Sequence, residues 1–390
     1  MTQLADAIVR SDPFEVATCW AHGFVPDQRR APTTTSPREA LAGVIRPALL
    51  DGPCYVTFSG GRDSSAVLAA ATALARAEGL ADPVPVTRRY PHIPDTDENE
   101  WQELVVSHLG LRDWIRLDLT DDETDLLGPT AQASIRRHGV LFPPALHSHG
   151  VVYQHMRGGS MLTGEGGDEV LGARRVTPLT LLRRRRTPTL ALLRRACDAL
   201  LPRPLRAAAV RHELPVAELQ SWLLPDAANR HSRMLAAAEA TEPLRFSDAI
   251  AWVGRKRVWH TMDINQRIVA SDYDVRAINP LIHPDFLAAL ARAGGFWGYN
   301  GRTSVMKALF ADVLPPSVLT RGSKGAFNRA YSGRYTQAFA REWDGTGVDT
   351  SLVDVVALRS QWLSDTPTMS AAMLLHSAWL GTQNNAEASS

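Results

Sequence analysis

The 390-residue sequence has few cysteines, no long apolar segment and little net charge. Its three cysteines are widely spaced and form no Cys-x-x-Cys pair, which argues against a disulfide framework or a zinc site and fits a reducing cytoplasm. No apolar run reaches about 18 residues, and no basic and apolar secretory signal opens the chain, so we expect no membrane association. The formal net charge of +1 predicts no broad surface for nucleic acid.

The turn that follows the apolar run Tyr55–Phe58 carries neither of two common phosphate-binding motifs. It lacks the Walker pattern Gly-x4-Gly-Lys-Ser/Thr and the dinucleotide pattern Gly-x-Gly-x-x-Gly. In their place stands Ser-Gly-Gly-Arg-Asp-Ser-Ser at residues 59–65, followed by the helical pattern Ala66–Ala70. The order is therefore strand, glycine-rich turn and helix, which favours a phosphate site over a plain turn.

Each residue type in this turn suits a nucleotide triphosphate. Gly60 and Gly61 let backbone N–H groups turn inward, and a helix N-terminus adds partial positive charge. Hydroxyl donors come from Ser59, Ser64 and Ser65. Asp63 would repel phosphate unless a cation lay between them, so the turn predicts ATP with Mg²⁺.

A second turn, Leu162–Gly172, crowds three acids into five positions, at Glu165, Asp168 and Glu169. Such crowding is costly unless a metal, a proton or a cation offsets it. If a parallel sheet brings the two turns together, Asp63 and Asp168 can flank Mg²⁺. The alternative is a solvated acidic turn without function.

The pattern of the chain predicts an α/β fold, with a parallel sheet, helices on both faces and a mostly helical C-terminal part. Expected strands are Cys54–Ser59, Val84–Tyr90, Trp114–Leu119 and Met161–Thr163. Expected helices are Pro37–Leu50, Ser64–Ala77, Asp97–Leu109, Thr130–His138 and His147–Arg157. Both turns then lie at the carboxyl ends of strands, where ligands bind in such sheets.

We expect three segments along the chain. Residues 1–37 form an N-terminal segment and linker, residues 38–330 form the nucleotide-binding domain, and residues 331–390 form a helical tail. Within the domain, residues 177–270 are expected to be helical. This part includes the run Arg183–Arg186, which is interpreted as a solvated surface or a site that steers an acidic partner.

Together the two turns resemble the synthetase domain of the asparagine synthetases, an ATP-pyrophosphatase (adenine-nucleotide α-hydrolase-like) domain. The β-lactam synthetases and the lasso-peptide macrolactam synthetases belong to the same superfamily. Two weaker matches follow in the family's order, at Tyr273–Pro284 and at Leu314–Phe327. The sequence departs from the family's pattern at Arg62, Asp274 and His283, which weakens any assignment of asparagine as the product.

The resemblance implies an AMP-forming amide ligase that adenylates a carboxylate and transfers the acyl group to an amine. It makes Lys324 the residue that stabilises charge at the α-phosphate, and Glu165 the general base, with Asp274 assisting. We also expect Thr87 and Gly164 to line the ATP site, and Asp63 and Asp168 to hold Mg²⁺.

Because the first turn already begins at residue 59, we expect no glutaminase domain. The nitrogen would then come from free ammonia, a small amine or an amine of the substrate itself. The last case would make the protein a lasso-type macrolactam cyclase. A further alternative is a non-catalytic ATP-binding subunit beside a biosynthetic partner protein.

Overall fold

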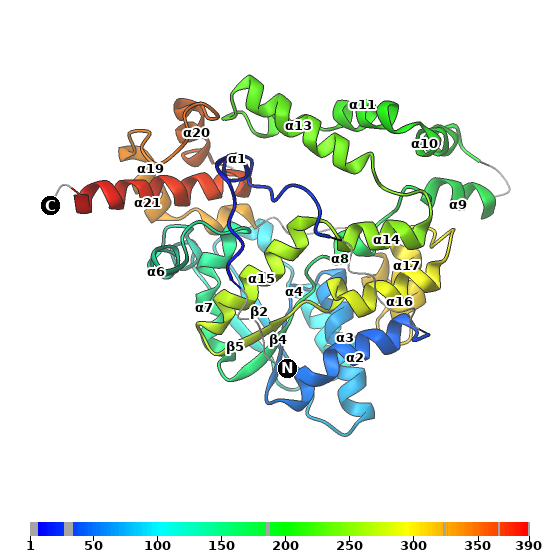
Figure 1. Ribbon diagram of the computed structural model, residues 1–390. Helices are drawn as coiled ribbons and strands as arrows, with labels where there is room; N and C mark the ends of the chain where they lie inside the picture. The colour runs from blue at the N-terminus through cyan, green and yellow to red at the C-terminus, as the bar shows by residue number, and fades with distance from the viewer. Residues whose placement is uncertain are drawn as a thin grey trace.

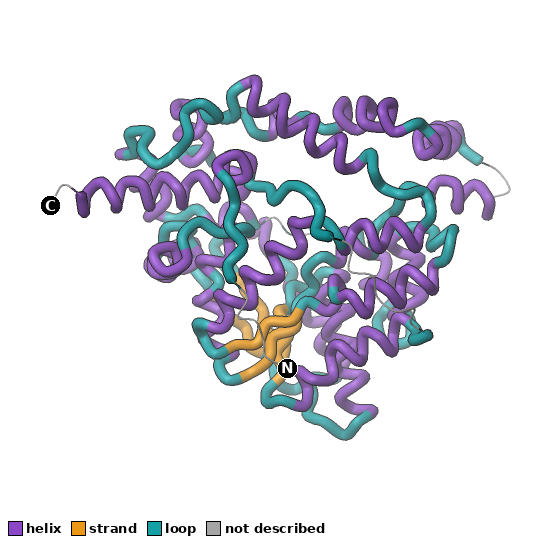
Figure 2. The backbone as a smooth tube through the Cα atoms, in the orientation of Figure 1, coloured by secondary structure: helices purple, strands orange, loops and turns teal. Residues whose placement is uncertain are grey.

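The computed structural model of the protein describes residues 7–26, 34–184, 188–322, 325, 327–365 and 367–388. At its centre lies a five-stranded sheet in the order β3-β2-β1-β4-β5, with every neighbouring pair parallel. The strands are β1 (Cys54–Thr57), β2 (Val84–Arg89), β3 (Ile115–Asp118), β4 (Gly159–Leu162) and β5 (Val275–Ile278). Helices surround this sheet (Figures 1 and 2). The expected α/β fold with a parallel sheet is confirmed.

Four of the strands are expected from the sequence, and β5 is the exception. It has only four residues, and the exposed Arg276 interrupts its apolar side chains. The helix expected at His147–Arg157 is also broken, into the 3-10 turns η2 (Pro144–Ser148) and η3 (Gln154–Met156) with α7 (Gly150–Tyr153) between them.

The strand order reverses beside β1. From β1 the chain moves outward through β2 to β3, by way of α3 (Arg62–Ala77) and α4 (Asn99–Leu109). It then returns to the other side of β1 as β4 and β5. The loops that follow β1 and β4 therefore part at the carboxyl edge of the sheet, and the crevice between them is where open α/β sheets bind ligands.

Each face of the sheet carries its own hydrophobic cluster, because neighbouring residues of a strand point to opposite faces. In β4, Met161 belongs to one cluster and Leu162 to the other. The Leu162 side is covered by α2 (Pro37–Leu50), α3, α4, α14 (Phe246–Gly254), α16 (Pro284–Gly294), α17 (Arg302–Phe310) and α18 (Pro316–Thr320). The Met161 side is covered by α6 (Pro129–His138), α7, α15 (Arg257–Ser271) and α21 (Ala372–Ala388).

The expected helical part forms an arch above the sheet. It consists of α9 (Thr177–Arg184), α10 (Leu190–Leu200), α11 (Arg203–Glu213), α12 (Val216–Leu219) and α13 (Pro225–Glu239). Figure 1 shows α10 and α11 at the outer part of this arch, far from the strands. The chain comes back to the sheet through α14 and α15.

The C-terminal helices α19 (Arg334–Glu342), α20 (Val355–Trp362) and α21 lie at the opposite end of the molecule, next to α1 (Pro13–Thr18) (Figure 1). Their side chains share the cluster of the Met161 side of the sheet. The remaining short elements are η1 (Pro94–Thr96), α5 (Asp121–Thr124), α8 (Gly167–Val170), η4 (Pro280–Ile282), η5 (Asn328–Tyr331) and η6 (Met369–Ala371). Within the described ranges, no helix combines the length and the apolar character that crossing a membrane requires.

Asp125 fastens the C-terminal helices to the loop before α6. Its fully buried carboxylate accepts hydrogen bonds from the backbone N–H groups of Leu127 (2.8 Å), Tyr335 (3.0 Å) and Thr336 (3.0 Å). Two of these donors belong to the first turn of α19, where backbone N–H groups have no partner inside the helix.

We therefore expect Asp125→Ala to leave buried donors unpaired and to lower the free energy of unfolding by about 2–5 kcal/mol. The matched control is Asp349→Ala, which removes an exposed carboxylate that accepts from the Ser351 N–H in a surface turn. Chemical denaturation of both variants tests this. An equal loss of stability in the two would show that Asp125 is not an anchor.

Candidate active site

A pocket of about 450 Å³ lies at the carboxyl edge of the sheet, in the crevice between β1 and β4. Seven of the residues that the sequence singles out line it: Ser59, Gly61, Asp63, Ser64, Gly164, Glu165 and Asp168. The structure thus brings together two turns that are about a hundred residues apart in the chain, as the sequence predicts.

The first turn runs from the end of β1 into α3. Gly60 has a φ of 78°, a conformation that glycine adopts without strain. The Ser64 hydroxyl donates to the Gly61 carbonyl (3.2 Å) and lies 3.2 Å from the Ser59 hydroxyl, whose oxygen accepts from the Gly61 N–H (3.3 Å). This local network fixes the start of α3, whose first backbone N–H groups have no partner inside the helix.

The second turn packs against the first with no space between their backbones. A Cβ atom at Gly164 would lie 2.6 Å from the Ser64 nitrogen, and one at Gly167 would lie 2.4 Å from the Asp63 carboxyl carbon. Side chains at either position would therefore push the turns apart. The glycines are explained by this close approach, rather than by flexibility of a surface turn.

Arg302, from the first turn of α17, bridges the two carboxylates that the sequence predicts as magnesium ligands, Asp63 and Asp168. Its guanidinium forms an ion pair with Asp63 (Nη2–Oδ2 2.6 Å) and a second one with Asp168. Both carboxylates therefore lie within reach of one guanidinium group. Burial alone would lower the pKa of Arg302, but the two carboxylates outweigh it and raise that pKa.

The sequence did not reveal Arg302, since an arginine among 42 basic residues carries no signal of its own. The pattern Gly301-Arg302 at the start of a helix was the available hint. Three further arginines line the pocket: Arg62 in the first turn, Arg88, which donates to the Tyr331 hydroxyl (2.6 Å), and Arg321, which donates to the Gly60 carbonyl (2.9 Å) and pairs with Glu98. Lys324, the predicted catalytic cation, lies outside the described residues, between Gly322 and Gly325, which both line the pocket.

Glu165 is exposed at the mouth of the second turn, and a buried network fixes the backbone before it. Its N–H donates to the Thr163 hydroxyl (3.1 Å), which in turn bonds to the side chain of Asn279. The Asn279 amide donates to Asp263 (2.9 Å) and Gln266 (2.8 Å) on α15. Asn279, which follows β5, is a positioning residue that the sequence analysis missed together with that strand.

Three predicted residues lie near the pocket without lining it. The Gly60 backbone forms the turn itself. The Ser65 hydroxyl is buried in α3 behind the pocket. The Thr87 hydroxyl points into the core, where it donates to the Phe58 carbonyl (2.9 Å) and accepts from the Trp114 indole (2.9 Å). The neighbours of Thr87, Val86 and Arg88, line the pocket instead.

Asp274 is not brought to the pocket. It is exposed and precedes β5, where its carbonyl accepts from the Gly158 N–H (2.8 Å) at the amino end of β4. Glu165 follows the carboxyl end of β4, so a full strand of four residues, about 13 Å, separates the two acids. The assisting role expected for Asp274 beside Glu165 does not fit this placement. The expectation came from the order of residues in the family motif, in which strand β5 was not recognised.

A larger cavity of about 680 Å³ adjoins the pocket along the outer edge of β5, between α2 and α15. Trp259 lines both cavities, and its ring lies against the turn at Gly166 together with Ile282. The wall of this second cavity is mixed, with apolar side chains beside His260, Asp263 and His283. It offers space for a second molecule next to the first pocket.

No curated protein matches the chain. The family model described as asparagine synthase matches residues 38–388, which is nearly the whole of the sequence. This family consists of ATP-using ligases that form amides, and its match includes both turns and the described lining of the pocket. The chain therefore belongs to the asparagine synthase family.

Proposed function

We propose that this protein is an AMP-forming amide ligase that activates a carboxylate with ATP and passes the acyl group to an amine, in the biosynthesis of a specialised metabolite or peptide. The observation that supports this most is the convergence of Asp63 and Asp168 on one cation, directly at the N-terminus of α3. The N–H groups that would bind phosphate, at the start of α3, then lie next to the carboxylates that would bind the metal, Asp63 and Asp168.

The residues present fit Mg²⁺. Asp63 and Asp168, which both contact one guanidinium, can hold one ion. The part of the chain that the structure describes contains no group of three or more metal-binding side chains. Magnesium in nucleotide sites is commonly held by one or two carboxylates, with phosphate and water as its other ligands. When bound, it would neutralise charge on the pyrophosphate.

In the first step the substrate carboxylate attacks the α-phosphorus of ATP, and pyrophosphate leaves. The N–H groups of the α3 turn and the hydroxyls of Ser59 and Ser64 would hold the phosphates, while Arg302 and Lys324 supply positive charge. Such preorganised donors contribute most where negative charge develops. Among the described residues, four arginines and four acids line the pocket, so their formal charges balance before Lys324 is counted.

In the second step an amine attacks the acyl-adenylate, and AMP leaves. The attacking nitrogen must lose a proton, and Glu165 is our candidate base because it is exposed at the pocket while its backbone is held by Thr163. The amine either belongs to the same molecule, which gives a lactam or macrolactam, or to a second molecule. The cavity beside Trp259 offers room for either.

The nucleotide products test the proposal directly. With α-labelled ATP, Mg²⁺ and pooled amino acids, hydroxy acids and short peptides, we expect AMP and pyrophosphate and no ADP. Pyrophosphate–ATP exchange should depend on the carboxylate pool. Release of ADP in its place would assign the protein to a different class of ligase.

Loss of the charge of Asp63 or of Arg302 should slow the first step, the adenylation of the carboxylate. We expect Asp63→Asn and Arg302→Met each to lower pyrophosphate exchange by about 10²–10³-fold, as is typical for one preorganised contact. The matched control is Asp82→Asn, whose carboxylate pairs with Arg76 on the surface (2.8 Å) and should leave exchange unchanged. Near-normal exchange in both site variants would mean that ATP binds elsewhere.

Variants of Glu165 and Lys324 should distinguish adenylation from amide formation. Glu165→Gln retains shape but loses basicity, so exchange should persist while amide formation falls by about 10²–10⁴-fold. Lys324→Ala should block exchange itself. Rapid-quench measurement of acyl-AMP and amide distinguishes these outcomes. If Glu165→Gln abolished exchange as fully as Lys324→Ala, Glu165 would belong to the ATP or metal site.

A further inference from the structure

The outer helices of the arch carry a charge that the rest of the chain does not share. Residues 183–212 contain nine arginines and a single acidic residue, Asp198, whereas the whole chain has a formal net charge of +1. The remainder is therefore net acidic. Arg194, Arg195 and Arg203 are exposed, and within the described ranges none of the three forms an ion pair.

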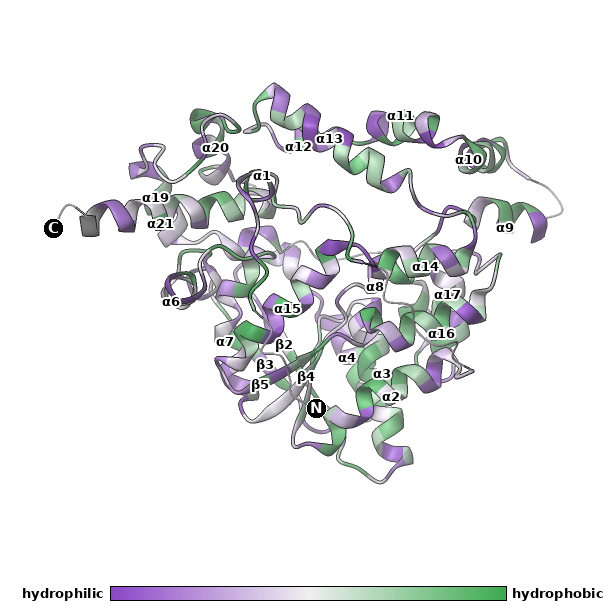
Figure 3. Ribbon diagram, in the orientation of Figure 1, coloured by the Kyte–Doolittle hydropathy of each residue, from purple (hydrophilic) through white to green (hydrophobic). Residues whose placement is uncertain are grey.

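An apolar stripe runs along the exposed side of α10. Leu190, Leu193, Cys197 and Leu200 follow one another at spacings of three, four and three residues, which places them on one side of a helix. The three leucines are 85%, 40% and 57% exposed, and Cys197 is exposed as well. The side that packs into the protein consists of Leu192, Ala196 and Ala199. In Figure 3 α10 carries much of the hydrophobic colour, although the helix lies at the outer end of the arch.

Such a stripe has the spacing of a helix–helix seam, in which apolar residues alternate at three and four positions. Arg194 lies one turn from Leu190 and beside Cys197, so a positive charge borders the seam. Arginine prefers carboxylates, which it binds through two parallel hydrogen bonds. The complementary surface is a helix with an apolar seam bordered by Asp and Glu.

We propose that the exposed face of α10, bordered by Arg194 and with the exposed Arg195 and Arg203 close by in the chain, docks an acidic amphipathic helix of a partner protein. A second copy of this chain would place arginine against arginine, which disfavours self-pairing. An anionic membrane is a poorer fit, because residues 183–212 contain no aromatic side chain and the stripe is narrow.

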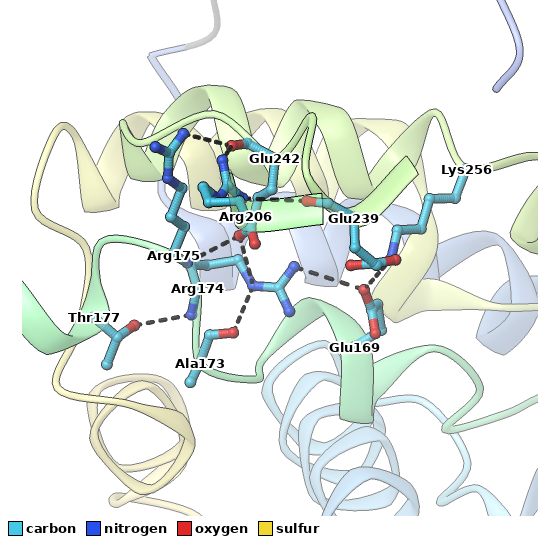
Figure 4. A network of polar contacts seen from close by, with 9 residues as sticks. All are labelled: Glu169, Ala173, Arg174, Arg175, Thr177, Arg206, Glu239, Glu242 and Lys256. Carbon is cyan, nitrogen blue, oxygen red and sulfur yellow. Dashed lines mark hydrogen bonds and ion pairs between the residues drawn. The ribbon is translucent and has the colours of Figure 1, made fainter. Parts of the chain in front are cut away.

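Polar contacts link the end of α10 to the turn that carries Glu169, and Figure 4 shows the middle part of this network, from Arg175 to Glu169 and Lys256. Arg175 donates to the carbonyls of Ala199 (2.7 Å) and Leu201 (3.4 Å) at the end of α10, and to the Glu242 carbonyl (3.1 Å). The neighbouring Arg174 lies 3.7 Å from Glu169.

Lys256 completes this link, because it donates both to Glu169 (2.8 Å) and to Glu239 at the end of α13 (2.7 Å). Glu169 is adjacent to Asp168 in the second turn of the pocket. A helix docked on α10 would therefore be held at a fixed position relative to the site, which suits a protein that delivers a tethered substrate.

The test uses the full chain and two fluorescein-labelled synthetic helical peptides of 21 residues. Both have leucines in an a/d seam, and their flanking positions are all Glu in one and all Lys in the other. By fluorescence anisotropy, the Glu peptide should bind in the micromolar range and more weakly at high salt, whereas the Lys peptide should not bind.

Variants on the surface locate the interaction. Leu193→Ser combined with Arg194→Glu should weaken binding of the Glu peptide at least tenfold, with unchanged circular dichroism. The control pair, Leu219→Ser with Arg341→Glu, changes residues that are also exposed but lie elsewhere, and it should retain binding. Arg194→Glu with Arg195→Glu should gain affinity for the Lys peptide.

Several results would overturn the proposal. These are the absence of binding by the Glu peptide, equal binding of both peptides, or equal loss in the control pair. Binding to vesicles of phosphatidylcholine and phosphatidylglycerol that requires Leu193 would assign the face to a membrane instead. Concentration-dependent dimers that Leu193→Ser abolishes would assign it to a second copy.

Discussion

The contact between the two glycine turns is the constraint on which the rest of the site depends. Because β1 and β4 are adjacent and parallel, the loops that follow them leave the sheet side by side. Gly164 and Gly167 then allow the second turn to touch the backbone of Ser64 and the carboxyl of Asp63. Any Cβ at these positions would overlap atoms of the first turn, which cannot shift without moving the start of α3. The separation of Asp63 from Asp168 is thus set by backbone packing rather than by side-chain choice.

The sequence predicted those parts of the protein that depend on local pattern. The turns at Ser59–Ser65 and Leu162–Gly172, four strands and the parallel sheet all follow from residue order and hydrophobic runs. Residues whose role depends on distant neighbours were not predictable in this way. Arg302 meets Asp63 and Asp168 only after more than a hundred residues of intervening chain have folded, and Asn279 was missed with the four-residue strand β5. Asp274 was assigned to the site because the residues around it match a motif of the family. In the structure it precedes β5 and therefore lies at the opposite end of the sheet from the pocket.

The three crowded acids of the second turn show how the fold resolves a local electrostatic cost. Asp168 pairs with Arg302, Glu165 points to the pocket, and Glu169 turns the other way toward Lys256 and Arg174. Burial alone would raise the pKa of Glu169, but these two cations outweigh it and lower that pKa below its ordinary value. A sequence that looks like one acidic cluster is therefore divided among separate partners, and only part of it is available for chemistry.

The cations that bind Glu169 also hold the helical arch next to the second turn. Lys256 and Arg174 are largely buried, with side chains 11% and 8% exposed, and both depend on acids of the arch, Glu239 and Glu242. Removing one member of such a group leaves a buried charge without compensation, which costs far more than a surface ion pair contributes. The arch cannot then move away from the second turn without exposing these charges or leaving them unpaired. Its inner end is fixed to the site by electrostatics. At its outer end α10 is held through its last carbonyls by Arg175, while its opposite side presents leucines to the solvent.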